Sequence, residues 1–593
     1  MIQLSVLFLG ILFISSSTLL SEEQCQEHME TQAGCIRYEQ VDAYNAQEKV
    51  WILPHIPPVS YESLNEDIQK DDVKDEIELF NLDFNKSNIA LCPKLKSTSP
   101  GTYVLESSNY FRSLDDAKTL IEQKFVEEIF CPGKVEASIL ARQIRKLNKE
   151  RIKAVRDKKD DLVAELEGKI EIKKGQLNIV LQRINLFQSE ESGSFLLIPL
   201  EKQKLKKLAK YKVTMNERDT SGTYAPSNLI YYQFSRFLKT RVGVPVSVYR
   251  EVQATHHRVR VAENGEKLAR KLKENVSKSY RQLYNGWKRL RAAEENPGTY
   301  FMKKNIFSSE NEENIWGILI KDKGDRYPHH SKSRNSLNGI LPSKPGYDAR
   351  QVAFMNSTPF KALRGEIDWK SFATPLERLQ YQYWMQELSE IVILDFIFSQ
   401  QDRVGNIDYR DYIYYLEDNS LGKKKINKWN KFKAKNESVI ELGKIRRTFL
   451  NDNDAGVRLA YSNFSKKNNF PGLIRHMDHR FLARLIYLNN SLKDAESSQY
   501  KYLLKNFVEP GLISQREFKQ IGKNLDMMLF GSSRIKTNLS KTCDEIIFDV
   551  DPESFAKQMV NNNHNDLIQT SEVNVNCEKL FSGSSEDEYI IIE

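Results

Sequence analysis

The spacing of hydrophobic residues predicts helices in four parts of the chain. From residue 135 to residue 188, apolar side chains recur mostly every three, four or seven positions among charged residues, with no proline. This pattern predicts a long helix, or a helical hairpin that turns near residues 156–161. Residues 263–295 and 471–531 are further helical stretches. Residues 375–398 are apolar on nearly every side, which is typical of a helix at the centre of a folded core.

Short apolar runs between turns predict β-strands on both sides of a helix. The predicted strands are residues 194–200, 208–215, 242–250, 314–320 and 412–416. The second of them carries Lys210 and Lys212, and a helix over residues 227–238 follows it after a turn rich in Ser, Gly and Pro. Helices and strands that alternate irregularly in this way indicate an α+β fold.

The pattern divides the chain into six segments. They are a signal peptide over residues 1–21, a cysteine-containing cap over 22–134, a helical arm over 135–188, a small lobe with insertions over 189–350, a large lobe over 351–531 and a tail with two cysteines over 532–593. A chain of 593 residues is long enough to bury more than one hydrophobic core, which agrees with several units.

The start of the chain indicates export. Residues 4–20 form an apolar stretch that ends in serines and precedes the acidic residues Glu22 and Glu23. Its length predicts a cleaved secretory signal, although no Lys or Arg comes before it. No later segment has about twenty consecutive apolar residues, so we expect no membrane span after cleavage. The protein is therefore expected to be secreted or periplasmic.

The cysteines support the same location. They are Cys25, Cys35, Cys92, Cys131, Cys543 and Cys577. An even number confined to the two ends of the chain predicts disulfides that staple the terminal segments, with scattered buried thiols as the alternative. The sequence leaves their pairing open. The chain has no Cys-x-x-Cys pair or Cys/His cluster, which argues against a structural zinc site.

The charge of the chain argues against nucleic-acid binding. The formal net charge of +8 is modest for 593 residues. The basic residues gather in helical and insertion segments rather than on aromatic-rich strands, so the usual footprint of a nucleic-acid surface is missing from the sequence.

Two polar loops carry the candidate chemistry. Asp402 and Asn406 follow the apolar helix directly, and an acidic turn with Asp452 and Asp454 before Gly456 comes later in the chain. Phosphoryl transfer needs a carboxylate that orients the attacking hydroxyl and oxygen ligands for Mg²⁺. A calcium loop of the EF-hand type is the rival interpretation, but a count from Asp402 fails at three required positions.

The ordered set of strand lysine, helix, apolar helix, Asp-Arg loop and Asp-Ala-Gly turn resembles atypical secreted and bacterial kinase-like families. These are the Golgi secretory kinases, the spore-coat CotH kinases and the HipA-type kinases. The resemblance covers roughly residues 194–530. It implies a two-lobed protein-kinase-like fold, to which the chain adds a disulfide-linked amino-terminal cap and a coiled-coil-like helical arm.

The resemblance also implies roles for individual residues. Asp402 would be the catalytic aspartate, and Asp454 would be the principal Mg²⁺ ligand. Asp452 could assist it, and Asn406 would be either a metal-side residue or a brace of its loop. A lysine on a strand ahead of a helix pairs with nucleotide phosphates, so Lys212, with Lys210 beside it, would bind the phosphates of ATP.

The sequence departs from the family pattern at three points. Asn406 lies four residues after Asp402, where the families have five, which leaves Asp408 as a substitute. The helix over 227–238 has no acidic residue to pair with the strand lysine, so Glu217 or Glu251 would have to stand in. No run of closely spaced glycines precedes the lysine either.

Two functions therefore follow from the sequence. The first is Mg²⁺-dependent transfer of a phosphoryl group from a nucleotide such as ATP to a protein hydroxyl. The alternative is an inactive pseudokinase that acts as a secreted scaffold and binds a partner protein through the helical arm. Residues 135–188 are also a candidate homodimer surface, although packing on the rest of the chain explains their pattern equally well.

Overall fold

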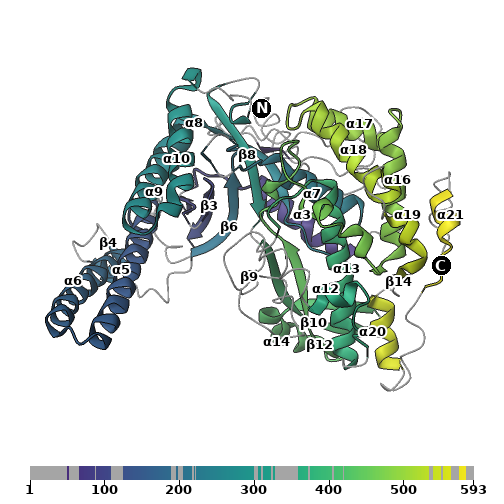
Figure 1. Cartoon of the computed structure of the whole chain (residues 1–593), viewed down its shortest axis with the longest axis horizontal. Coiled ribbons are helices and arrows are strands. Elements are labelled where there is room, and N and C mark those ends of the chain that lie inside the picture. The colour runs from purple at the N-terminus through teal and green to yellow at the C-terminus, as the bar shows by residue number, and fades with distance from the viewer. Residues whose placement is uncertain are drawn as a thin grey trace, which may run out of the picture.

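The chain folds into helices and mostly antiparallel sheets, which confirms the α+β class (Figure 1). The computed structural model describes residues 50–51, 66–86, 88–95, 97–107, 125–188, 195–197, 205–216, 219–220, 222–299, 305–308, 312–321, 325–326, 358–370, 374–403, 406–418, 420–532, 538–548, 552–561 and 573–582. The predicted signal peptide, Cys25 and Cys35 lie outside these ranges. Within them, no helix combines the length and the apolar character that crossing a membrane requires.

The predicted helical arm is a hairpin. Helix α5 (Cys131–Arg156) follows the π-helix η1 (Phe125–Phe130), and α6 (Asp160–Asn185) runs back beside it. The chain reverses at Lys158, whose φ of 54° is left-handed. The two helices come so close that a side chain at Gly133 would collide with Ile184. Beyond the hairpin, β4 (Leu186–Gln188) pairs with β5 (Phe195–Leu197), a shorter strand than the predicted 194–200.

A six-stranded sheet forms one half of the core, and every neighbouring pair in it is antiparallel. Its order is β1 (Val50–Trp51), β7 (Ser247–Gln253), β8 (Asn314–Lys321), β6 (Leu205–Lys212), β3 (Thr102–Ser107) and β2 (Ile89–Pro93). The segment predicted as a separate cap, residues 22–134, instead supplies β1, β2 and β3 to this sheet. Strand β1 pairs with β7 and β3 pairs with β6, while β2 pairs in turn with β3 at the edge of the sheet.

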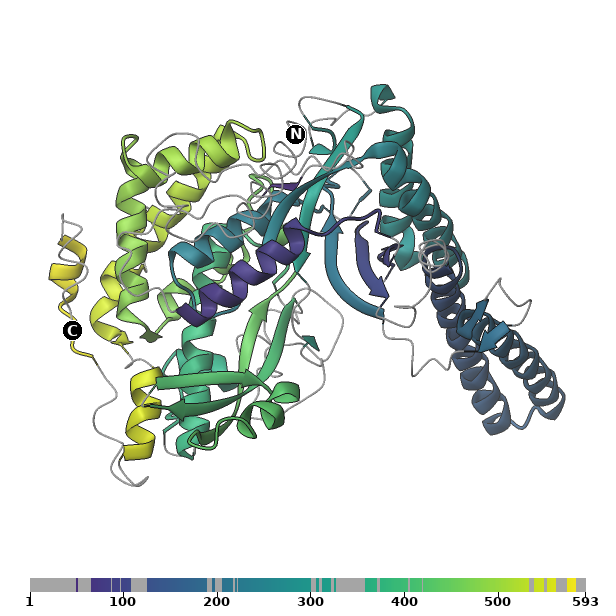
Figure 2. The same cartoon turned by 180° about the vertical axis from the view of Figure 1, so that it is seen from behind.

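Helices cover this sheet on one side. Helix α7 (Pro226–Phe237), close to the predicted helix over 227–238, follows β6 and is buried along almost its whole length. Helix α3 (Glu66–Phe80) lies along it, and Figure 2 shows α3 in purple beside the teal α7. Two side-chain contacts join them, from Tyr232 to Glu76 at 2.5 Å and from Arg236 to Asp72 at 3.1 Å.

A further group of helices connects the sheet to the arm. These are α8 (Ala254–His257), η3 (Arg258–Ala262), α9 (Glu263–Asn275), η4 (Lys278–Tyr280), α10 (Arg281–Glu295) and η5 (Pro297–Thr299). They confirm the predicted helical stretch at 263–295. Helix α9 packs on α5, so the base of the arm is fixed to the sheet by this group (Figure 1).

A disulfide between Cys92 and Cys131 joins β2 to the first residue of α5. The two cysteines are 39 residues apart, and a cross-link of this length restricts the unfolded chain. We therefore expect the double variant Cys92→Ala, Cys131→Ala to lose about 2–4 kcal/mol of unfolding free energy. Urea unfolding of both oxidised proteins measures it. With reductant present the two proteins should unfold alike, and equal midpoints in the oxidised state would contradict the expectation.

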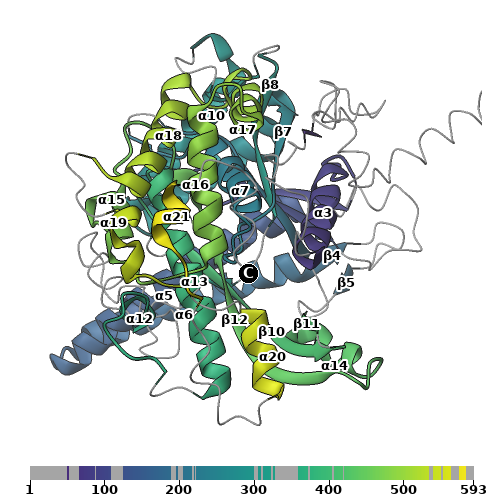
Figure 3. The same cartoon turned by 90° about the vertical axis from the view of Figure 1, so that its right-hand side faces the viewer.

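The apolar helix predicted at 375–398 is α13 (Pro375–Ile397), the centre of the second half of the core. It begins with a capping box between Thr374 and Glu377 and is buried from Tyr381 to Ile397. On one side lies a four-stranded sheet of β9 (Asp325–Arg326), β10 (Ile407–Glu417), β11 (Ser420–Lys425) and β12 (Ile440–Leu450). Figure 3 shows α20 (Pro552–Asn561) beside α13 and β11.

The remaining elements complete this half and include the predicted helices of residues 471–531. They are α12 (Thr358–Leu363), α14 (Ile426–Lys433), η8 (Asn453–Ala455), α15 (Phe464–Lys467), η9 (Pro471–Leu473), β13 (His476–Met477), α16 (His479–Lys493), α17 (Ser498–Leu503), η10 (Leu504–Val508), α18 (Gln515–Phe530), α19 (Leu539–Thr542), η11 (Cys543–Glu545), β14 (Ile547–Phe548) and α21 (Cys577–Ser582). A second disulfide, Cys543 to Cys577, holds α21 in the tail against η11.

Candidate functional site

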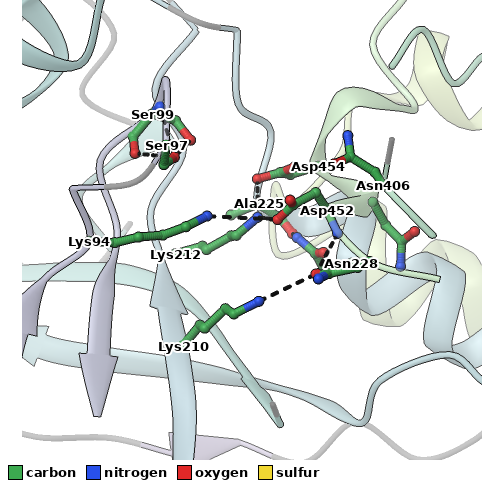
Figure 4. A network of polar contacts seen from close by, with 12 residues as sticks. Lys94, Ser97, Ser99, Lys210, Lys212, Ala225, Asn228, Asn406, Asp452 and Asp454 are labelled. Carbon is green, nitrogen blue, oxygen red and sulfur yellow. Dashed lines mark hydrogen bonds and ion pairs between the residues drawn. The ribbon is translucent and has the colours of Figure 1, made fainter. Parts of the chain in front are cut away.

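The end of β6 meets the acidic turn that follows β12. Lys210 and Lys212 are two positions apart on the strand, so both side chains point to the same face. The Lys212 ammonium lies 2.7 Å from an oxygen of Asp452 and 2.7 Å from an oxygen of Asp454. Lys210 donates to the Asn451 side chain at 3.4 Å (Figure 4). The fold thus brings together four of the six predicted site residues.

The central ion pairs are shielded from water. The side chain of Lys212 is 3% exposed, that of Asp454 10% and that of Asp452 22%. Burial by itself would lower the pKa of Lys212, but the two carboxylates outweigh it and raise that pKa above its ordinary value. Lys212 is therefore a fixed positive charge that holds two carboxylates side by side.

The first turn of α7 positions the acidic turn. Asp452 adopts a left-handed backbone with φ of 48°, which reverses the chain at the end of β12. The Ser227 hydroxyl donates to the Asn453 carbonyl at 2.7 Å, and the Tyr224 amide donates to the Asp454 carbonyl at 2.8 Å. The helix that follows the strand lysine thus fixes the carboxylates that the lysine binds.

Arg403 joins the Asp402 loop to the acidic turn from below the surface. Its buried guanidinium forms an ion pair with Asp395 of α13 at 3.0 Å. It also donates to the Asn453 side chain at 2.7 Å, to the Asn451 carbonyl at 2.8 Å and to the Asn406 carbonyl at 3.1 Å. One side chain therefore ties α13, the Asp402 loop and the acidic turn into a single unit.

Asp402 itself is exposed at the surface of its loop. The Asn406 side chain donates to the Asp402 carbonyl at 2.6 Å and lies 3.5 Å from its carboxylate. These contacts fit the loop-bracing role for Asn406, whereas its metal-side role stays a prediction. Asp408, the suggested substitute, is buried in β10, where its carboxylate accepts from the Asn451 amide at 2.5 Å. Asp408 thus supports the residue that Lys210 contacts.

The sequence interpretation missed the turn between β2 and β3, which the structure describes at residues 94–95 and 97–101. Its first residue, Lys94, lies 3.8 Å from the same Asp452 oxygen that binds Lys212. Burial lowers the pKa of Lys94 to about 8, although Asp452 opposes the shift. A lysine- and serine-rich turn that directly follows a short apolar strand was the available signal.

Of the two residues suggested to replace the missing helix glutamate, the structure describes only Glu251. Glu251 lies on β7, where it accepts from the Tyr249 hydroxyl at 3.0 Å, and Glu217 lies outside the described residues. Asp452 and Asp454 occupy that role in this structure. The strand lysine is therefore anchored to the acidic turn rather than to α7.

The described residues contain no cluster of three or more carboxylate, imidazole or thiolate side chains that could hold a metal on their own. Mg²⁺ does not need one, because it is commonly bound by one or two carboxylates together with substrate phosphates. Asp452 and Asp454 converge on one cationic nitrogen at 2.7 Å each. This donor set suits a Mg²⁺ ion that arrives with a nucleotide.

Comparisons of the chain with protein-family models, with curated proteins and with solved structures gave no match.

Proposed function

We propose that the chain is an exported kinase-like enzyme that transfers a phosphoryl group from a nucleotide such as ATP to a protein hydroxyl. The observation that carries the proposal is the contact of Lys212, on β6, with Asp454, in the turn that follows α13 and β12. A strand lysine and a metal-binding aspartate from distant parts of the chain are the two groups that meet at the phosphates in kinases.

The order of the sheet supports the same proposal. Counted along the chain from β2, β6 is the third strand that joins this sheet, in which the neighbours from that edge are β2-β3-β6-β8-β7. Helix α7 is the next element after β6. In protein kinases the phosphate-binding lysine is on the third strand and a helix follows that strand. The two disulfides among the described cysteines fit an exported protein, because disulfides persist in oxidising compartments.

Each group has a part in the proposed reaction. Lys212 would bind phosphate oxygens, and Asp454 and Asp452 would hold the metal. A Mg²⁺ ion held by these carboxylates would supply positive charge against the charge that develops in transfer. Asp402, exposed on its braced loop, would orient the hydroxyl of an incoming protein substrate and accept its proton.

The exposed face of the helical arm supports the alternative function, an inactive scaffold. Ile172 and Ile179 on α6 are 64% and 66% exposed. Their spacing of seven residues places them on one face of the helix. Gly168 and Gly175 lie on the same face, with open space where their side chains would be. This face would suit a partner protein, whether or not the site is active.

A lysine pair on β6 gives a matched test of the enzyme proposal. We expect Lys212→Met to weaken Mg-nucleotide binding by about tenfold to a hundredfold, since it removes a buried charge-assisted donor. Lys206→Met is the control, because Lys206 lies on the same strand and is 59% exposed. Calorimetric titration of the full chain with ATP and Mg²⁺ measures both, with thermal unfolding to confirm folding. An absence of nucleotide binding by the wild type would overturn the proposal and favour the scaffold.

A further inference from the structure

Helix α6 carries two stripes of apolar and small residues on opposite faces. The first is buried in the hairpin with α5 and consists of Leu166, Ile170, Val180 and Ile184. The second contains Gly168, Ile172, Gly175 and Ile179, spaced four, three and four residues apart as in the seam of a coiled coil. Residues two positions apart, such as Ile170 and Ile172, point to nearly opposite sides of a helix. The second stripe therefore faces away from α5.

Exposed apolar side chains are concentrated on the arm. Of the twelve large apolar side chains that are exposed among the described residues, six lie on α5 and α6: Ile152, Val155, Leu162, Ile172, Ile179 and Leu181. Ile172 and Ile179 are the most exposed of the twelve. Figure 1 shows the arm projecting away from the two sheets, where another protein can reach it. Exposed apolar side chains gathered on one surface mark an interaction site.

The glycines of the second stripe are holes that match its isoleucines. Neither Gly168 nor Gly175 has an atom within 4 Å of the point where a Cβ would lie. In an antiparallel pair of α6 helices, Ile172 would lie opposite Gly175 of the second copy, and Ile179 would lie opposite Gly168. The two-fold axis repeats both contacts, so all four isoleucines enter glycine holes. A parallel pair in register would set glycine against glycine and leave voids.

The charges of α6 favour the same orientation. Its first half, residues 160–171, has five carboxylates and one lysine, whereas residues 172–185 have three basic residues and no carboxylate. Several of these charges already form exposed pairs within the arm, which are Lys169 with Glu165, Lys174 with Glu171, Glu167 with Arg151 and Arg183 with Glu136. Exposed pairs contribute little, so the net charge of each half is what a partner meets. An antiparallel copy sets acidic half against basic half.

We infer that α6 forms an antiparallel helix pair with α6 of a second copy of the chain, so that the protein is a reversible dimer joined through its arms. Knobs of isoleucine in holes of glycine supply the close approach, and the opposite charges of the two halves fix the direction. The inference is independent of the proposed function, since it concerns a surface outside the lysine and aspartate site.

Sedimentation equilibrium of the full chain measures the dimer. We expect Gly168→Leu with Gly175→Leu to weaken dimerisation by about tenfold or more, because leucines fill the holes. The same variant should not unfold at a lower temperature, because its new side chains enter open space and leucine forms helix better than glycine. Ile172→Lys should also weaken the dimer. Ile152→Lys is the matched control, because Ile152 is 63% exposed but lies on α5.

Salt tests the direction of the pair. Raising NaCl from about 0.05 M to about 0.5 M should weaken the dimer, because screening reduces the attraction between the opposite halves. A dimer that salt strengthens would contradict the antiparallel order, since parallel copies set like charges side by side. A chain that stays monomeric up to about 100 µM would overturn the inference and leave the face to a different protein. A dimer that survives the glycine substitutions, or that only Ile152→Lys weakens, would overturn it by placing the contact elsewhere.

Discussion

Asp402→Asn is expected to stop phosphoryl transfer while nucleotide binding continues, and Asp454→Asn is expected to abolish Mg²⁺-dependent binding as well. Asp402 is exposed and contacts its own loop, so its amide variant removes a proton acceptor without disturbing the phosphate site. A positioned general base contributes about a hundredfold to ten-thousandfold to rate. Asp454 contacts Lys212 and is a proposed metal ligand, so its loss acts on binding and transfer together.

Autophosphorylation and calorimetric titration, each with and without Mg²⁺, separate the two roles. Asp161→Asn serves as the control, because Asp161 is an exposed aspartate in the first turn of α6, far along the arm. Unchanged Mg²⁺-dependent binding in Asp454→Asn would count against the metal assignment. Unchanged phosphoryl transfer in Asp402→Asn would show that Asp402 is not the general base.

Arg403→Met is expected to have the largest effect on stability. It leaves the Asp395 carboxylate buried without its ion-pair partner, and breaking a buried pair typically costs about 3–5 kcal/mol. It also removes three donors that hold the two loops, to Asn451, Asn453 and Asn406. We therefore expect a lower urea midpoint together with weaker nucleotide binding, since the acidic turn loses its brace.

A double variant distinguishes the two consequences. In Arg403→Met with Asp395→Leu no buried carboxylate is left behind, so we expect much of the stability to return, because an apolar pair can replace a buried ion pair. Nucleotide binding should stay weak, since the donors to the acidic turn are still missing. A single variant that loses less than about 1 kcal/mol would show that the guanidinium does not hold the loops together.

Local patterns in the sequence predicted several of the individual elements. The periodicity of residues 135–188 predicted a long helix or a hairpin, of which α5 and α6 form the hairpin, and the apolar run at 375–398 predicted α13. Lys212 was placed on a strand ahead of a helix, and Asp454 was placed in a turn. These features depend on side-chain spacing and turn chemistry within a few residues, which a sequence displays directly.

The contacts between distant segments were decided only in the tertiary structure. Lys212 and Asp454 are 242 residues apart, and no local pattern states that they touch. The same holds for Lys94, which directly follows β2, a strand that pairs with β3 rather than belonging to a separate cap, and for the pairing of Cys92 with Cys131. Strands pair and opposite charges form ion pairs where the packed core places distant segments of the chain side by side. The sequence by itself therefore supplied the two lysines of β6 and the aspartates, while the sheet decided that Lys94 would share their site.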